Sequence, residues 1–216
     1  PANPSPMLEP KTAISPELEK LQRSLADLDA NPPQPAAILA KSQPVETYYR
    51  KRIELMQQII PLDKADHREA WYKQLFANMA AMAQNSGDAA TIAKLNEFKN
   101  QVVKNMPGSN LAAYGVYRCT WTDYAIALAN NPAQMEIVKL QEKWLSDLAA
   151  FVKDFPKADD TPEALYQLAV GCEFNGKLAE SKRSYQLLIE NFPDNHQAPP
   201  AKGALARLNL ELFDQQ

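Results

Sequence analysis

The amino-acid sequence predicts an all-α protein built from antiparallel helical hairpins. Apolar residues recur at i, i+3, i+4 and i+7 in long runs, which is the spacing of an amphipathic helix, and the polar–apolar alternation of a strand is absent. Prolines separate many of these runs, whereas the chain has only six glycines and no glycine-rich loop. Because the connections between the predicted helices are short, neighbouring helices are expected to pack antiparallel, as in bundles and α-solenoids.

The first part of the chain is expected to start flexibly and then to form divergent helical hairpins over residues 15–130. Residues 1–14 are rich in proline and lack apolar periodicity, so we predict a flexible N-terminal segment. Ser15 as N-cap and Pro16 as first helical residue mark the start of the first helix. After a short helical turn near 38–39, a helix is predicted after Pro44 to about Ile60, with Pro61 ending it. Further helices are predicted from Asp63 as a cap to about Gln84, from Asp88 to 105, and from Ser109 or Asn110.

Residues 131–216 are expected to form a helical repeat with a C-terminal capping helix, continuous with the preceding helices. Asn131 is predicted to cap a helix that runs to about Asp154, with Pro132 at its first position and Gln134 completing a capping box. Beyond this helix six residues recur 37 positions later, which indicates stacked helical units. The matching residues are Phe155, Pro156, Pro162, Ala164, Leu168 and Ala169, followed by Phe192, Pro193, Pro199, Ala201, Leu205 and Ala206.

The helix pair between these boundaries resembles a tetratricopeptide repeat over about 32 residues. The pattern positions are held, at the right spacing, by Leu165, Leu168, Ala169, Cys172, Ser181, Tyr185 and Pro193. Ala169 and Ser181 are small where the two helices of such a repeat approach closely, and Gly176 supplies a left-handed residue at the turn. Alanine, cysteine and serine replace the family's glycine, tyrosine and alanine, so the copy is divergent. The resemblance implies a tetratricopeptide-like α-solenoid that ends in a capping helix over 200–213.

A looser resemblance concerns the order of the helices. The long helices, the helix of Trp144 that ends at Phe155, the repeat and the segment 203–211 resemble the helical region before a thioredoxin-like (redoxin) domain in certain bacterial envelope proteins, notably of planctomycetes. This resemblance implies an exported protein of the periplasm or cell envelope, with a redox domain beyond residue 216. The sequence itself contains no C-x-x-C pair, and no basic stretch precedes an apolar one as in a signal peptide.

Composition excludes some classes of partner. The formal net charge of −3 lacks the basic footprint of a nucleic-acid-binding protein. No apolar run approaches the roughly 20 residues that a membrane span needs. Cys119 and Cys172 are far apart in the sequence and have apolar neighbours, so we expect two buried thiols; a disulfide between them is the alternative in an oxidising compartment.

No catalytic, cofactor or metal site is predicted. His67 and His196 are the only histidines and lack ligands at zinc-site spacing, so surface positions are expected for both. The aromatic stripe Tyr114, Tyr117, Trp121 and Tyr124 has two interpretations, a helix core or a stacking surface, and the core is favoured. On the same helix Arg118, Thr122 and Asp123 are candidates to point into a groove, and the alternative is that Arg118 and Thr122, at i and i+4, form a solvated face.

The tetratricopeptide resemblance implies one candidate partner-binding groove. Its residues, on the inner face of the repeat's first helix, are Glu163, Tyr166, Val170 and Glu173. This mixed apolar and acidic face lacks the Asn, Lys and Arg of a carboxylate clamp, so we expect a shallow groove for a peptide or partner helix, with a preference for basic ligands. The alternative is that the face packs on the neighbouring hairpin.

The expected function is therefore a non-catalytic helical scaffold or protein-interaction module of tetratricopeptide type, whose partner is a protein or peptide. The rival expectation is the N-terminal helical region of a thioredoxin-like thiol–disulfide oxidoreductase, whose catalytic domain follows residue 216.

Overall fold

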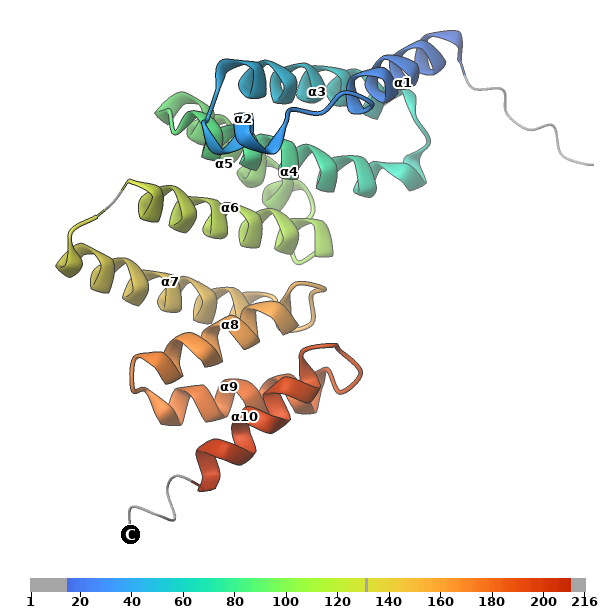
Figure 1. Cartoon of the computed structure of the whole chain (residues 1–216). Coiled ribbons are helices and arrows are strands. Elements are labelled where there is room, and N and C mark those ends of the chain that lie inside the picture. The colour runs from blue at the N-terminus through green and yellow to red at the C-terminus, as the bar shows by residue number, and fades with distance from the viewer. Residues whose placement is uncertain (1–14, 131, 211–216) are drawn as a thin grey trace, which may run out of the picture.

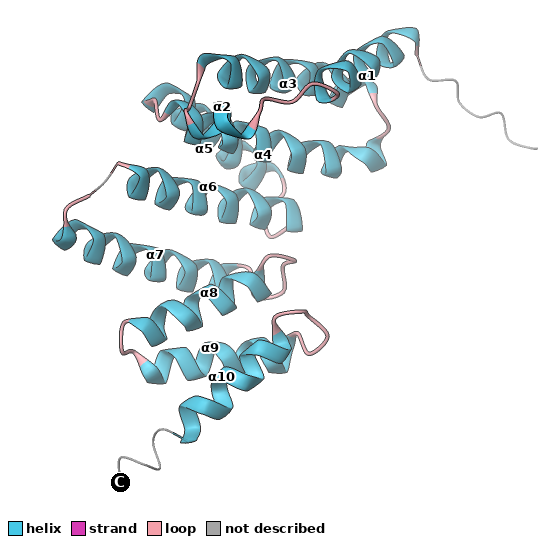
Figure 2. Cartoon of the chain, in the orientation of Figure 1, coloured by secondary structure: helices cyan, strands magenta, loops and turns pink. Residues whose placement is uncertain are grey.

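The computed structural model describes residues 15–130 and 132–210, and this part of the chain is all-helical, which confirms the predicted class (Figures 1 and 2). No strand occurs in the described residues. The predicted flexible segment 1–14 and the predicted cap Asn131 lie outside them. The helices are α1 (Pro16–Asp29), α2 (Pro35–Leu39), α3 (Gln43–Leu62), the 3-10 turn η1 (Ala65–His67), α4 (Arg68–Ser86), α5 (Ala89–Asn105), α6 (Asn110–Ala129), α7 (Gln134–Asp154), α8 (Thr161–Phe174), α9 (Leu178–Asn191) and α10 (Ala198–Leu210).

The helices form one stack in chain order. Each helix from α3 to α10 packs on the next one along the chain, α1 packs on α3, and α4 also packs on α6. Figure 1 shows this order from α1 and α3 at the top to α10 at the bottom. Because the chain reverses between α6 and α7 and again between α7 and α8, α6 and α8 run in the same direction.

The core consists of four apolar clusters that follow the stack. One lies between α1, α3 and α4, and the next between α4, α5 and α6. The third joins α6, α7 and α8, and the last joins α8, α9 and α10. Their centres are fully covered side chains such as Met56, Phe76, Leu148 and Leu188, each 0% exposed. Since burying such a side chain contributes about 1.5–3 kcal/mol, each helix is stabilised mainly by its neighbours in the stack.

Three predicted helix starts are confirmed by side-chain caps. Oγ of Ser15 accepts a hydrogen bond from the backbone N–H of Leu18 at 3.1 Å. Asp88 and Ser109 cap α5 and α6 in the same manner, at 2.9 Å and 3.1 Å. Gly176 adopts the predicted left-handed conformation after α8, with φ of 71°.

The same turn ends three helices of the stack. Met106, Phe155 and Phe192 follow α5, α7 and α9 with φ of −136°, −128° and −136° and ψ of 59°, 60° and 55°. In each turn the carbonyl of this residue accepts a hydrogen bond from the N–H three residues later, at 3.2, 3.3 and 3.1 Å. The 37-residue match between Phe155 and Phe192 therefore corresponds to one backbone conformation, and Met106 shares it without sharing the sequence pattern.

Three local predictions were wrong. Asp63 does not cap the next helix; it follows α3, its carboxylate binds groups of the α3–α4 connection and Trp71, and α4 begins only at Arg68. At the start of α7, Glu136 and not Gln134 accepts the hydrogen bond of the capping box, from the N–H of Ala133 at 2.9 Å. Pro61 lies within the last turn of α3, which ends at Leu62.

Candidate interaction surface on α8

The helix α8 has one buried face and one partly exposed face. Successive residues are about 100° apart around the helix axis, so residues three or four positions apart share a face. Ala164, Leu165, Ala169 and Cys172 are buried against α7 and α9. The predicted groove residues are arranged on the other side. Val170 is 41% exposed there, and Phe174, one turn further on, is 84% exposed. The α8 surface is therefore only partly covered by its neighbours.

The acidic ends of the predicted groove are already bonded within the chain. Glu163 accepts hydrogen bonds from Nε2 of Gln167 at 2.8 Å and from Nε2 of Gln197 at 2.5 Å. Glu173 pairs with Arg207 of α10 at 2.5 Å. Because Arg207 offsets the charge of Glu173, the face offers a basic ligand less negative charge than its sequence suggests.

Tyr166 is held between the exposed and the buried parts of this surface. Its ring meets the ring of Tyr185 edge to face, with the centroids 6.0 Å apart. The Tyr185 side chain is 2% exposed, and its hydroxyl lies 3.5 Å from Glu173. Burial, together with the Glu173 carboxylate, raises the pKa of Tyr185 to about 12. Tyr166 is therefore positioned by packing on α9 and remains half-buried.

A small cleft joins the predicted groove to α6. It has a volume of about 200 Å³ and is lined by Tyr117, Arg118 and Trp121 of α6 and by Glu163 and Gln167 of α8. The structure thus brings Glu163 together with Tyr117 and Trp121 of the aromatic stripe, a proximity that the sequence does not predict. Gln167 was not predicted, although it lies one turn after Glu163 and so shares its face.

The aromatic stripe of α6 is core except for one member. Tyr124 stacks on Trp144 with the centroids 4.8 Å apart, and Tyr117 packs on Phe151 at 5.4 Å. Tyr114 lies 6.2 Å from Phe76 in an edge arrangement. Trp121 remains 39% exposed beside the cleft. The three tyrosines are therefore half-buried against the core clusters, as the favoured interpretation expects, although Tyr117 also lines the cleft, and Trp121 is the most exposed of the four.

The three polar residues of α6 have different surroundings in the structure. Arg118 lines the cleft, lies over the ring of Tyr114 at 5.2 Å and donates a hydrogen bond to its hydroxyl at 3.0 Å. Thr122 is 0% exposed and donates to the carbonyl of Arg118 at 2.8 Å, so its placement on a solvated face was wrong: α6 is covered from more than one side. Asp123 is exposed.

A charged cluster borders the cleft on the side of α4. Nζ of Lys73 lies 2.9 Å from Glu69 and 3.6 Å from Asp159. Asn110 and Asp159 exchange two hydrogen bonds, at 3.1 Å and 3.3 Å. Burial raises the pKa of the neighbouring Asp160 carboxyl, while Lys73 and Arg118 act to lower it. These contacts link the ends of α4, α6 and α8 and set the position of the cleft walls.

The two histidines and the two cysteines are the remaining candidates for chemistry. His67 and His196 are exposed, as predicted, and His67 lies 3.1 Å from Asp63. Cys119 and Cys172 are buried free thiols, and burial raises the pKa of both. Over residues 15–130 and 132–210, no three His, Cys, Asp or Glu side chains are grouped so that they would hold a metal ion. No helix in the described part is long and apolar enough to cross a membrane.

Comparison with known proteins adds no relative: the chain matches no family model, and no curated protein is significantly similar to it.

Proposed function

We propose that this chain is a non-catalytic helical scaffold of tetratricopeptide type, which binds a peptide segment across α6 and α8. Trp121 and Val170 carry the proposal. They are two partly exposed apolar side chains on α6 and α8, which run in the same direction. Trp121 lines the cleft that also contains Arg118 and Glu163, and Val170 follows the cleft residue Gln167 by three positions, on the same face of α8.

The exposed apolar surface continues along both helices. Leu128 follows Trp121 by seven residues on α6, and Phe174 follows Gln167 by seven residues on α8, so each lies on the same face as its predecessor. Leu128 is 39% exposed and Phe174 is 84% exposed. An extended peptide with alternating apolar side chains would bury this strip, while Arg118 and Glu163 offer a cation and an anion to its polar groups.

Packing details support the tetratricopeptide type. Ala169 and Ser181 are each 0% exposed where α8 and α9 approach, which requires small side chains. Tyr185 fills the seam beside them, and α10 packs on α9 in the place of the first helix of a following repeat. The connection from α5 to α6, where no sequence repeat is evident, has the same turn at Met106 as the connections at Phe155 and Phe192.

The test is a peptide selection against the immobilised chain, followed by affinity measurement on single variants. Peptides selected on the wild type are expected to bind Val170→Ser and Trp121→Ala at least about tenfold more weakly, because hot-spot truncations cost about 1.4 kcal/mol or more. Val138→Ser is the matched control, since Val138 is 49% exposed but lies on α7. Equal affinity for Val170→Ser, Trp121→Ala and Val138→Ser would contradict the proposal.

A further inference from the structure

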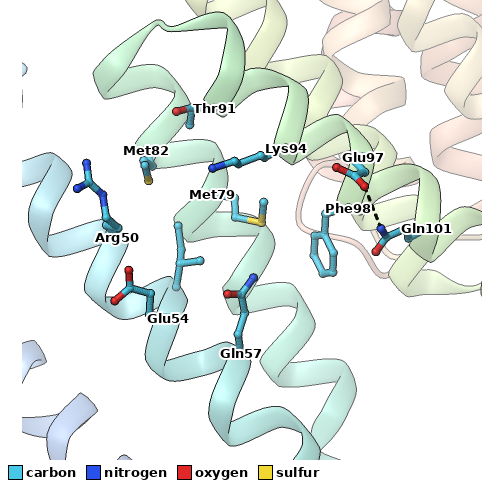
Figure 3. A pocket seen from close by; sticks show the side chains of 11 residues that line it. Arg50, Glu54, Gln57, Met79, Met82, Thr91, Lys94, Glu97, Phe98 and Gln101 are labelled. Carbon is cyan, nitrogen blue, oxygen red and sulfur yellow. Dashed lines mark hydrogen bonds between the residues drawn. The ribbon is translucent and has the colours of Figure 1, made fainter.

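A second groove lies in the N-terminal half of the stack, between α3 and α5 over α4 (Figure 3). Its volume is about 480 Å³. Apolar side chains of all three helices form its floor: Ile53, Met79, Met82 and Phe98. Each of the four is only half-buried, so the floor is accessible. Methionine is flexible and polarisable, and it adapts to the side chains of a binding partner.

The two walls carry the same order of charges. Along α3 the lining residues are Arg50, Glu54 and Gln57, and along α5 they are Lys94, Glu97 and Gln101. Successive residues in each set are three or four positions apart, so they occupy successive turns on one face. Each wall therefore presents a base, then an acid, then an amide. The chain reverses between α3 and α4 and again between α4 and α5, so α3 and α5 run in the same direction. The order of charges on α3 and the order of charges on α5 therefore run the same way along the groove.

No ion pair crosses this groove among the described residues. Arg50 pairs with Glu46 of its own helix, and Glu97 accepts a hydrogen bond from Gln101 at 3.4 Å, also within one helix. Lys94 and Glu54 are exposed. Because both walls have the same order of charges, like charges face each other across the groove and cannot neutralise each other. A segment with the opposite order of charges would pair with both walls at once.

We propose that this groove binds an amphipathic helix of a partner protein. The apolar stripe of that helix covers Ile53, Met79, Met82 and Phe98. One turn carries a carboxylate for Arg50 and Lys94, and the adjacent turn carries a cation for Glu54 and Glu97. The lining residues of α5 extend from Thr91 to Gln101, which corresponds to about 15 Å of helix at about 1.5 Å per residue, so two to three turns of the partner are engaged.

This inference is independent of the α6–α8 cleft, because the two sites have no lining residue in common. A helix fits here better than an extended strand, since the parallel walls and the helical floor form three sides of a helical bundle. The partner chemistry is thus an apolar stripe flanked by one acidic and one basic turn.

The test uses a fluorescein-labelled designed helix with a leucine stripe, one glutamate-flanked turn and one lysine-flanked turn. Fluorescence anisotropy with the full chain is expected to show binding. Arg50→Glu with Lys94→Glu, and separately Glu54→Lys with Glu97→Lys, should each weaken binding about tenfold or more, because two attractive pairs become repulsive. All four changes together invert the order of charges on both walls and should restore binding, since the helix can then bind in the opposite direction.

Lys51→Glu with Lys104→Glu is the matched control. It changes the net charge by the same amount as Arg50→Glu with Lys94→Glu, on the same two helices, at exposed residues outside the groove lining. Circular dichroism of every variant checks that the fold is retained. Three results would overturn the inference: no binding to the wild type, equal losses in the control and the groove variants, or no recovery in the fourfold variant. Sedimentation that shows a dimer broken by the groove variants would also overturn it, since the occupant would then be a second copy of the chain.

Discussion

The indole Nε1 of Trp71 donates a hydrogen bond of 2.6 Å to Oδ2 of Asp63, and this bond ties the end of α3 to the first turn of α4. The same carboxylate accepts the backbone N–H of Lys64 at 2.8 Å and lies 3.1 Å from Nδ1 of His67. The Asp63 side chain is only 7% exposed. One carboxylate therefore organises the whole α3–α4 connection.

Removing this carboxylate is expected to destabilise the N-terminal half. Asp63→Ala leaves the Trp71 N–H and the Lys64 N–H without their acceptor, so the free energy of unfolding should fall by about 1–3 kcal/mol. Urea unfolding followed by circular dichroism measures the change. Trp71→Phe removes the donor alone, and the double variant then gives the coupling energy. Additive losses in the two single variants would mean that the Asp63–Trp71 bond contributes nothing to stability.

Asp63 also makes stability depend on pH. Burial acts to raise the pKa of its carboxyl, but the hydrogen bonds from Trp71, Lys64 and His67 lower the pKa below its usual value. A carboxyl with a lowered pKa in the folded state stabilises the fold above its unfolded pKa of about 4, and this contribution is lost as pH falls through the folded pKa. We therefore expect the unfolding free energy to decrease below about pH 4–5, and to decrease less steeply in Asp63→Asn. A slope that is identical in the two proteins would contradict this assignment.

The wrong prediction for Asp63 shows which hydrogen bonds of the fold can be predicted from the local sequence. The caps Ser15, Asp88 and Ser109 bond to an N–H three residues later, so the sequence around each cap contains the whole interaction. Asp63 instead bonds to an indole eight residues away, and its role depends on how α4 returns over α3. Helix type and helix order therefore follow from periodicity and turn residues, whereas the function of a single polar side chain does not.

The candidate surface on α8 could also be predicted only in part from the sequence. The spacing of Tyr166 and Val170 indicated one face of α8, and the structure leaves that face partly exposed. Its partners were not predictable, because Gln197 and Arg207 each lie 34 residues beyond the glutamate they contact. Likewise, Arg118 and Glu163 line one cleft only because α6 and α8 approach each other on one side of the stack.

The two thiols are expected to be unreactive in the folded chain. Burial raises the pKa of Cys119 to about 12 and also raises the pKa of Cys172, so each thiol has a smaller thiolate fraction than an exposed cysteine. Ellman's reagent should react slowly with the native protein and fully with both thiols in denaturant. Cys172 lines the groove between α7 and α9, so the variant that retains only Cys172 should react faster than the variant that retains only Cys119. Rapid modification of Cys119 in the native state would contradict its burial.

A close contact between α4 and α6 depends on Gly115. A Cβ atom at this position of α6 would lie 2.5 Å from Cζ of Phe76 on α4. That ring is 0% exposed and packs on Phe98 at a centroid distance of 4.4 Å, so it has no free space into which to move. Gly115→Ala is therefore expected to lower the free energy of unfolding by about 1–3 kcal/mol, despite the better helix propensity of alanine.

Two other glycines within helices allow the loss of stability in Gly115→Ala to be compared with substitutions at less crowded positions. A Cβ at Gly171 would lie 2.5 Å from Cδ2 of Leu145, which is the end of a flexible side chain, so Gly171→Ala should cost less than Gly115→Ala. A Cβ at Gly203 of α10 would meet no atom of the described residues within 4 Å, and Gly203→Ala should stabilise the chain by about 0.5–1 kcal/mol. Urea unfolding of the three variants gives the order Gly203→Ala, Gly171→Ala, Gly115→Ala from most to least stable. If Gly115→Ala proved as stable as Gly203→Ala, α4 and α6 would have to be further apart than the backbone places them.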